Sequence, residues 1–140
     1  MKTINDDVFG QLTYDFQWER PEDVTVFGRP YKLLLTIESE SDNDESVSKV
    51  QQDAYKNFST QHTALEHEML QSLIQYCQSE LGVSHCDESG FAAHNTPTSI
   101  FFPLSGGWAI MFDSDYDEES GLAVVVRGDQ IDAGSQDIIL

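Results

Sequence analysis

Positively charged residues are scarce in this sequence. Its 140 residues contain 7 Lys and Arg against 25 Asp and Glu, which gives a formal net charge of −18. No Lys or Arg occurs from Asn57 to Val126, although this interval contains ten carboxylates. Such a chain repels nucleic acid and anionic lipid, and it attracts basic proteins and divalent cations. We therefore expect no nucleic-acid or membrane partner. The acidity either serves solubility or forms a surface for a basic protein partner.

Cysteines and long apolar segments are scarce as well. Cys77 and Cys86 are too few for a disulfide scaffold, so reduced thiols are expected. No run approaches the roughly 20 apolar residues of a membrane span. The N-terminal stretch MKTINDDVFGQL lacks the apolar segment of a signal peptide. These absences predict a cytoplasmic protein, and the length predicts a single domain over residues 1–140.

Catalytic signatures are missing too. The sequence contains no G-x-S-x-G, no P-loop, no G-x-G-x-x-G and no H-E-x-x-H. Three residues of one loop, His85, Cys86 and His94, are chemically able to bind a metal, but a structural role is the favoured interpretation. The sequence therefore predicts a non-catalytic protein with no cofactor and no metal ligands.

The first part of the chain shows strand and helix patterns. Residues 9–19 alternate, with Leu12, Tyr14, Phe16 and Trp18 on one face, which predicts a strand. A turn is expected at 20–23, and one or two strands over 24–40. Apolar residues at helical spacing then predict one helix from Ser46 or Ser48 to Phe58, and a second over 65–81. One long bent helix is the alternative.

The last part of the chain is rich in short apolar runs. Residues 83–97 are predicted to form a loop, and strands are expected at 98–104, 108–112, 122–126 and 136–140. Arg127-Gly128-Asp129 fits a tight hairpin turn. Together the segments predict an α+β domain with an antiparallel sheet of about five to six strands packed against two helices, in the order ββ-αα-βββ(β).

The most unusual stretch is AIMFDSDYDEESGLAVVV (109–126), in which an acidic segment lies between two of these apolar runs. An EF-hand needs Gly where this chain has Glu118 and Glu where it has Val124, so the sequence disfavours a calcium loop of that type. An aspartate-dependent phosphatase would need most of its domain after Asp113, and only 27 residues follow. A solvated loop and a recognition surface remain. The candidate partner-binding residues are Asp113, Asp115, Tyr116, Asp117, Glu118 and Glu119, and more weakly Glu40, Asp42, Asp44 and Glu45.

Several segments resemble a known family along nearly the whole chain. FGQLTYDFQWE, QQDAYKNF, PTSIFFP, FDSDYDEESGLAVVV and GSQDIIL occur in this order. The chain resembles a bacterial family of small acidic domains of unknown function, loosely associated with immunity proteins of polymorphic toxin systems. The resemblance implies an α+β domain and no known chemistry, and it assigns no functional residue.

The functional prediction combines charge, missing motifs and resemblance. We expect a cytoplasmic binding protein, most specifically an immunity protein that neutralises a toxin such as a nuclease through an acidic surface. Nuclease sites are positive because they bind phosphate, and carboxylates can replace the phosphates. Two alternatives stay open. One is a divalent-cation-binding protein or metal-dependent enzyme that uses the 113–119 loop, and the other is a housekeeping protein-interaction module.

Overall fold

A computed structural model describes residues 2–40 and 46–139, whose strands all belong to one sheet. The strands are β1 (Thr3–Asp6), β2 (Gly10–Asp15), β3 (Gln17–Val26), β4 (Arg29–Ile37), β5 (Asn95–Phe102), β6 (Trp108–Ser114), β7 (Leu122–Arg127) and β8 (Gln130–Ser135). The helices are α1 (Lys49–Ser79), α2 (Glu88–His94) and the 3-10 helix η1 (Gln136–Ile139). Spatial order follows sequence order.

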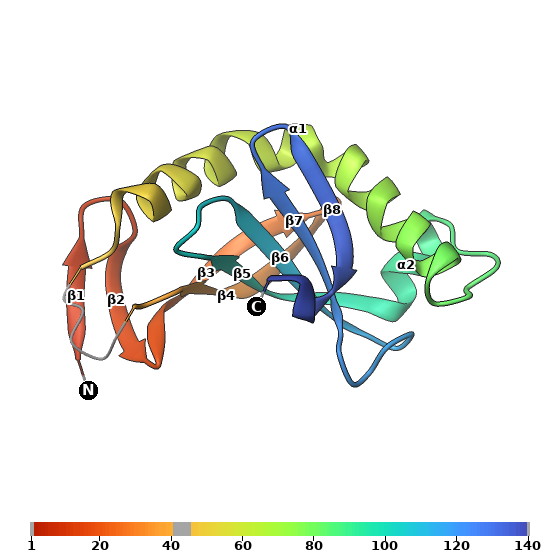
Figure 1. The fold of residues 1–140 in the computed structure, drawn as a ribbon, viewed down its shortest axis with the longest axis horizontal. Helices are drawn as coiled ribbons and strands as arrows, with labels where there is room; N and C mark the ends of the chain where they lie inside the picture. Colours follow the sequence, from red (N-terminus) through yellow and green to blue (C-terminus); the bar gives the residue numbers. More distant parts are fainter. Residues whose placement is uncertain (1, 41–45, 140) are drawn as a thin grey trace.

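The sheet is mixed. Neighbouring strands run antiparallel except β4 and β5, which are parallel. Between these two strands the chain crosses over through α1 and α2, and α1 spans the sheet from the β1–β2 hairpin to α2 (Figure 1). Parallel neighbours require such a crossover because a short turn only reverses the chain.

The predicted antiparallel sheet of about five to six strands in the order ββ-αα-βββ(β) is therefore wrong, although the fold is α+β overall. One cause is residue 16. Phe16 adopts a φ of +65° and its side chain is 84% exposed, so the chain reverses there. Residues 9–19 thus belong to two strands, with Leu12 and Trp18 buried on different ones. The turn expected at 20–23 lies inside β3.

Other boundaries differ at the C-terminal side. Residues 83–97, predicted as a loop, contain α2 and the start of β5. β8 was not expected from the sequence, and the strand expected at 136–140 is the helix η1 as far as residue 139. The hairpin turn is confirmed, because Gly128 adopts a φ of +59° between β7 and β8. Gly supplies this left-handed conformation without steric strain.

The two predicted helices are one, α1, so the alternative of a single helix is the observed arrangement. The N-cap at Ser48 is confirmed: its Oγ accepts a hydrogen bond from the backbone N–H of Gln51 at 3.2 Å. Gln51 is buried, and its Nε2 donates to the carbonyls of Glu38 (2.8 Å) and Phe102 (2.9 Å). These bonds attach the start of α1 to the ends of β4 and β5.

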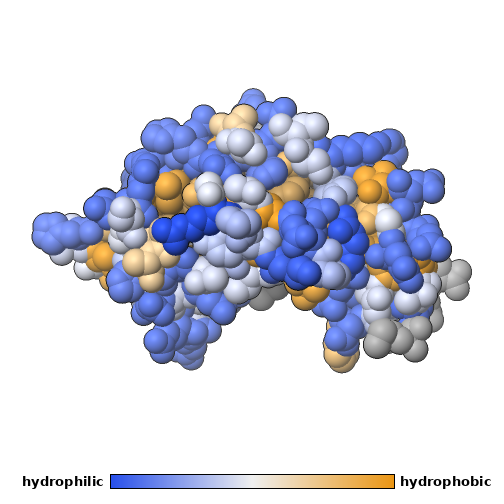
Figure 2. All heavy atoms as spheres, turned by 180° about the vertical axis from the view of Figure 1, so that it is seen from behind, coloured by the Kyte–Doolittle hydropathy of each residue, from blue (hydrophilic) through white to orange (hydrophobic). Residues whose placement is uncertain are grey.

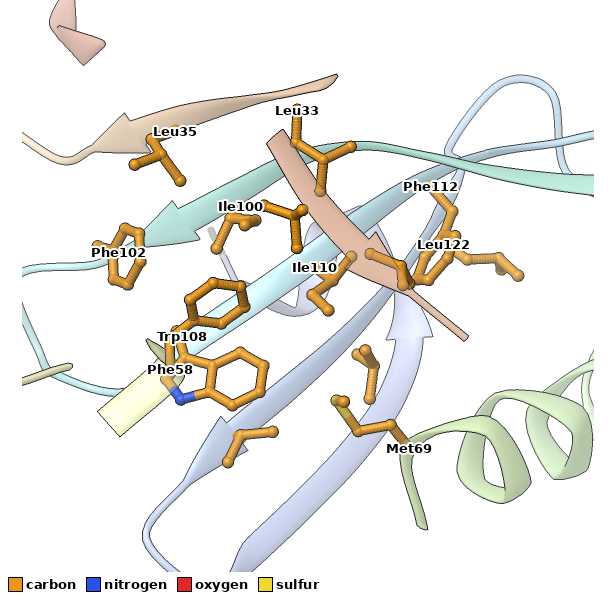
Figure 3. Close-up of a cluster of buried hydrophobic side chains, with 14 of the residues drawn as sticks. Leu33, Leu35, Phe58, Met69, Ile100, Phe102, Trp108, Ile110, Phe112 and Leu122 are labelled. Atoms are coloured by element: carbon orange, nitrogen blue, oxygen red, sulfur yellow. The ribbon is translucent and has the colours of Figure 1, made fainter. Parts of the chain in front are cut away.

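The core lies between α1 and one face of the sheet. Figure 3 shows side chains from the central strands, including Leu33, Ile100 and Ile110, together with Phe58 and Met69 of α1. The buried positions of α1 fall in two groups, one ending at Phe58 and the other beginning at Met69. Its middle turns bury no residue to the same degree. The other face of the sheet carries a small cluster, Phe101, Ala109 and Val125.

Candidate partner-binding surface

The acidic segment Asp113–Glu119 starts at the end of β6 and leads into the turn before β7. Side chains alternate along the strand, so Asp113 and Asp115 are exposed while Ser114 is buried. The Oγ of Ser114 accepts a hydrogen bond from the backbone N–H of Tyr116 at 3.1 Å. The backbone N–H of Asp115 donates to the carbonyl of His94 at 2.8 Å. The segment is thus fastened to the end of α2.

Asp117 shapes the turn. Its Oδ1 accepts from the backbone N–H of Ser120 at 3.1 Å, and its carbonyl accepts from the N–H of Gly121 at 2.8 Å. An Asp side chain that binds nearby backbone N–H groups stabilises a turn. Gly121 has a φ of +63°, and a Cβ there would lie 2.7 Å from the carbonyl oxygen of Phe112. Asp117 therefore has a structural task besides its charge.

Tyr116 is held against α2. Its hydroxyl donates to the carbonyl of Gly90 at 3.2 Å, and its ring lies 5.0 Å from the ring of His94, measured between centroids. Burial raises the pKa of Tyr116, with further contributions from Cys86 and Cys77. The side chain is only partly exposed. It anchors the acidic segment to the domain, and only part of its ring is accessible to a partner.

The exposed carboxylates surround a hollow of about 410 Å³, which we call the acidic hollow. Asp113, Asp115 and Glu118 line it together with His94 and Thr96. The Nδ1 of His94 lies 3.3 Å from Oδ2 of Asp115, and both side chains are substantially exposed. Carboxylates accept hydrogen bonds from Lys and Arg, and Arg binds them in a bidentate geometry. The hollow therefore has the charge and the acceptors to receive a basic side chain.

The second acidic cluster does not join this hollow as far as it is described. Glu40 follows β4, whose last residue pairs with Phe102 at the C-terminal end of β5. The acidic segment instead adjoins Asn95, at the opposite end of β5, because Asn95 pairs with Ser114. Asp42, Asp44 and Glu45 lie outside the described residues. Glu40 is exposed.

Residues 2–40 and 46–139 contain no ligand set for a metal ion. No group of three or more His, Cys, Asp or Glu side chains in that part of the chain is arranged to hold an ion. Cys86 is buried, whereas His85 and His94 are exposed. Burial raises the pKa of the Cys86 thiol, so the thiolate that a metal requires is disfavoured.

The sequence did not predict α2, whose last residue, His94, lines the acidic hollow next to Thr96 of β5. Asp87 is its N-cap, because its Oδ1 accepts from the backbone N–H of Gly90 at 2.7 Å. Asp before a short helix is a recognisable signal. Phe91 is the single buried residue of α2. One apolar anchor in seven residues gives too little periodicity to predict a helix.

Comparison with protein families places this geometry in context. A family model described as "Domain of unknown function (DUF6985)" matches residues 8–140. The chain belongs to the DUF6985 family. The comparisons with curated proteins and with solved structures found no match. Among the described residues, the DUF6985 chain has no helix that is both long and apolar enough to cross a membrane.

Proposed function

We propose that this DUF6985 chain is a non-catalytic binding protein that receives a basic protein partner in the acidic hollow. The observation that carries the proposal is the grouping of Asp113, Asp115 and Glu118 around one hollow on a segment fastened by backbone hydrogen bonds. The formal net charge of −18 adds a long-range field of the same sign. Such a field accelerates association with a positive partner.

The partner that fits best is the toxin of a bacterial toxin–immunity pair, with this chain as its cytoplasmic immunity protein. A nuclease toxin has a positive substrate-binding surface, and carboxylates held in fixed positions can replace the phosphates of its substrate. The fastening of the acidic segment supports this role, because a preformed surface loses less conformational entropy on binding. Tight binding also needs buried anchors, and the accessible part of Tyr116 is one candidate.

The test is co-expression with the open reading frame immediately upstream in the source genome. If that neighbour kills cells, we expect this chain to restore growth and to co-purify with it. The triple variant Asp113→Asn, Asp115→Asn, Glu118→Gln should lose the rescue. The matched control Asp129→Asn, Asp132→Asn, Asp137→Asn changes the net charge equally at other exposed positions and should retain it.

Three results would count against the proposal. A neighbour that is harmless and does not bind removes the toxin and leaves a housekeeping interaction module. Rescue that survives the triple variant moves the interface away from the acidic hollow. Loss of rescue in both variants shows that only the total charge matters.

A further inference from the structure

β3 is an interior strand of the sheet, yet most of its length is paired on one side only. β2 pairs with β3 only through residues Gln17–Glu19 of β3. From Arg20 to Val26, β3 pairs with β4 on one side, and no strand of residues 2–40 and 46–139 pairs with its other side. We call Arg20–Val26 the free edge of β3. Unpaired strand edges are templates for another strand.

The register identifies which backbone groups face outward on this edge. A two-residue turn, Phe27-Gly28, joins β3 to β4, with φ values of +50° and +80°. In such a turn Val26 accepts from Arg29, so alternate residues from Val26 backward bond to β4. The residues between them, Asp23 and Thr25, therefore direct their N–H and C=O groups away from β4.

Proline placement agrees with this register. Pro21 lacks an N–H, and it occupies an outward-facing position on the free edge, where no ladder bond to β4 is lost. Its carbonyl accepts from Nη1 of Arg20 at 3.2 Å. The groups left for a partner are thus those of Asp23 and Thr25, for which the described residues supply no hydrogen bond on this side.

A groove runs along the free edge between β3 and the middle of α1. Its volume is about 370 Å³, and its lining includes Asp23, Thr25, Tyr55, Phe58 and His62. The α1 residues of this lining extend from Tyr55 to Thr63, across the end of the first buried group at Phe58. Figure 2 shows the back of the molecule as largely hydrophilic with separate hydrophobic spots, so no broad apolar patch competes on that face.

The groove offers hydrogen-bond acceptors and an apolar base. The Nδ1 of His62 lies 2.9 Å from the carbonyl of Phe58, which only accepts, so Nδ1 is the donor of that hydrogen bond. Val24 and Phe58 are buried at the base. Glu22 forms an ion pair with Arg20. Asp23 is exposed and lies opposite Lys32 of β4, without a close ion pair between the two among the described residues.

We propose that the free edge of β3 binds an extended, basic peptide segment of a partner protein by strand addition beside α1. Main-chain hydrogen bonds to Asp23 and Thr25 hold the segment, and alternate side chains of the segment contact the groove. Apolar side chains face Val24 and Phe58, and Lys or Arg side chains lie on the other face beside Asp23. A second copy of this chain is a poor occupant, because it brings the same net charge of −18.

This site is separate from the acidic hollow and does not depend on a toxin. The test is an NMR titration of the full ¹⁵N-labelled chain with the capped peptide acetyl-Lys-Val-Lys-Val-Lys-Val-amide. We expect saturable shifts and slowed hydrogen exchange at the amides of Asp23 and Thr25, with shifts along Tyr55–Thr63. The peptide in which Glu replaces Lys should produce none of these.

Two matched variants separate local from total charge. Asp23→Lys and Asp129→Lys change the net charge equally at exposed sites. We expect Asp23→Lys to weaken peptide binding about fivefold and Asp129→Lys to change it less than about twofold. No saturable shift, shifts confined to 113–119, or equal effects of both variants would overturn the proposal. Concentration-dependent shifts of Asp23 and Thr25 without peptide would assign the edge to self-association and overturn it as well.

Discussion

The acidic hollow and the free edge of β3 present opposite kinds of chemistry. The hollow consists of side-chain charges on a turn that is fixed by its own backbone hydrogen bonds. The free edge consists of main-chain donors and acceptors, flanked by a helix whose middle leaves a groove open. Charge acts over long distances and is screened by salt, whereas strand pairing acts at contact. One acidic domain thus carries a charged hollow and an unpaired strand edge as two separate surfaces.

The largest expected effect concerns the turn that supports the acidic hollow. Gly121→Ala places a Cβ 2.7 Å from the carbonyl oxygen of Phe112 at a φ of +63°. We expect a loss of about 2–4 kcal/mol in the free energy of unfolding, measured by urea denaturation. Gly128→Ala is the control: it has a similar φ and open space, so only about 1 kcal/mol is expected. Equal losses would contradict the close packing at Gly121.

The next effect concerns the groove beside β3. The hydroxyl of Tyr55 lies 2.5 Å from Oε1 of Glu22 and 2.9 Å from Nη2 of Arg20. Tyr55→Phe removes both bonds, and we expect a loss of about 1–2 kcal/mol in thermal or urea unfolding. Tyr31→Phe serves as the control, because the described residues give its hydroxyl no hydrogen bond, and it should change stability by less than about 0.5 kcal/mol. A neutral Tyr55→Phe would show that this cluster does not stabilise the groove.

A smaller effect distinguishes structural from recognition carboxylates within the acidic segment. Asp117→Ala removes the hydrogen bond to the N–H of Ser120 and should lower the free energy of unfolding by about 1 kcal/mol. Asp113→Ala should change it by less than about 0.5 kcal/mol, since Asp113 is exposed. Denaturation of both variants in parallel checks the difference. A stability loss at Asp113 equal to that at Asp117 would refute the division of roles.

The smallest effect near neutral pH lies beneath the acidic segment. Burial raises the pKa of Cys77 from 9.0 to about 12. The unfolded thiol ionises first as pH rises, so the contribution of Cys77 to stability is complete below pH 9 and is lost between about 9 and 12. Urea denaturation across this range should show a weaker alkaline loss for Cys77→Ala than for the parent chain. Rapid labelling of the folded thiol at mildly alkaline pH would contradict its burial.

How much of this was predictable depends on whether the signal was local. The N-cap Ser48 with Gln51 and the Gly128 turn follow from neighbouring residues, and both are confirmed. The acidic segment can likewise be recognised from neighbouring residues in the sequence. Phe16 was misjudged because its alternation matched a strand, whereas it occupies the reversal between β2 and β3 with a left-handed φ and an 84% exposed side chain. The parallel pairing of β4 with β5 joins residues about sixty positions apart, which no local pattern reveals.

The free edge of β3 was unpredictable for a related reason. It exists because β2 leaves β3 after Glu19. Beyond that point the Nε of Arg20 donates a hydrogen bond to the carbonyl of Phe9 at 2.5 Å. In the sequence, Arg20 and Pro21 favour a turn over a strand. Only the register shows that Pro21 sits where its missing N–H costs no hydrogen bond. The charged segment could therefore be located from the sequence, whereas the unpaired backbone of β3 could not.

The most direct test of the proposed function is the association rate of this chain with the toxin candidate as a function of ionic strength. We expect a rate that falls steeply with added salt in the parent chain and in the Asp129→Asn, Asp132→Asn, Asp137→Asn control. The Asp113→Asn, Asp115→Asn, Glu118→Gln variant should associate more slowly and with a weaker dependence on salt. A rate independent of salt, or identical profiles for the two triple variants, would contradict binding through the acidic hollow.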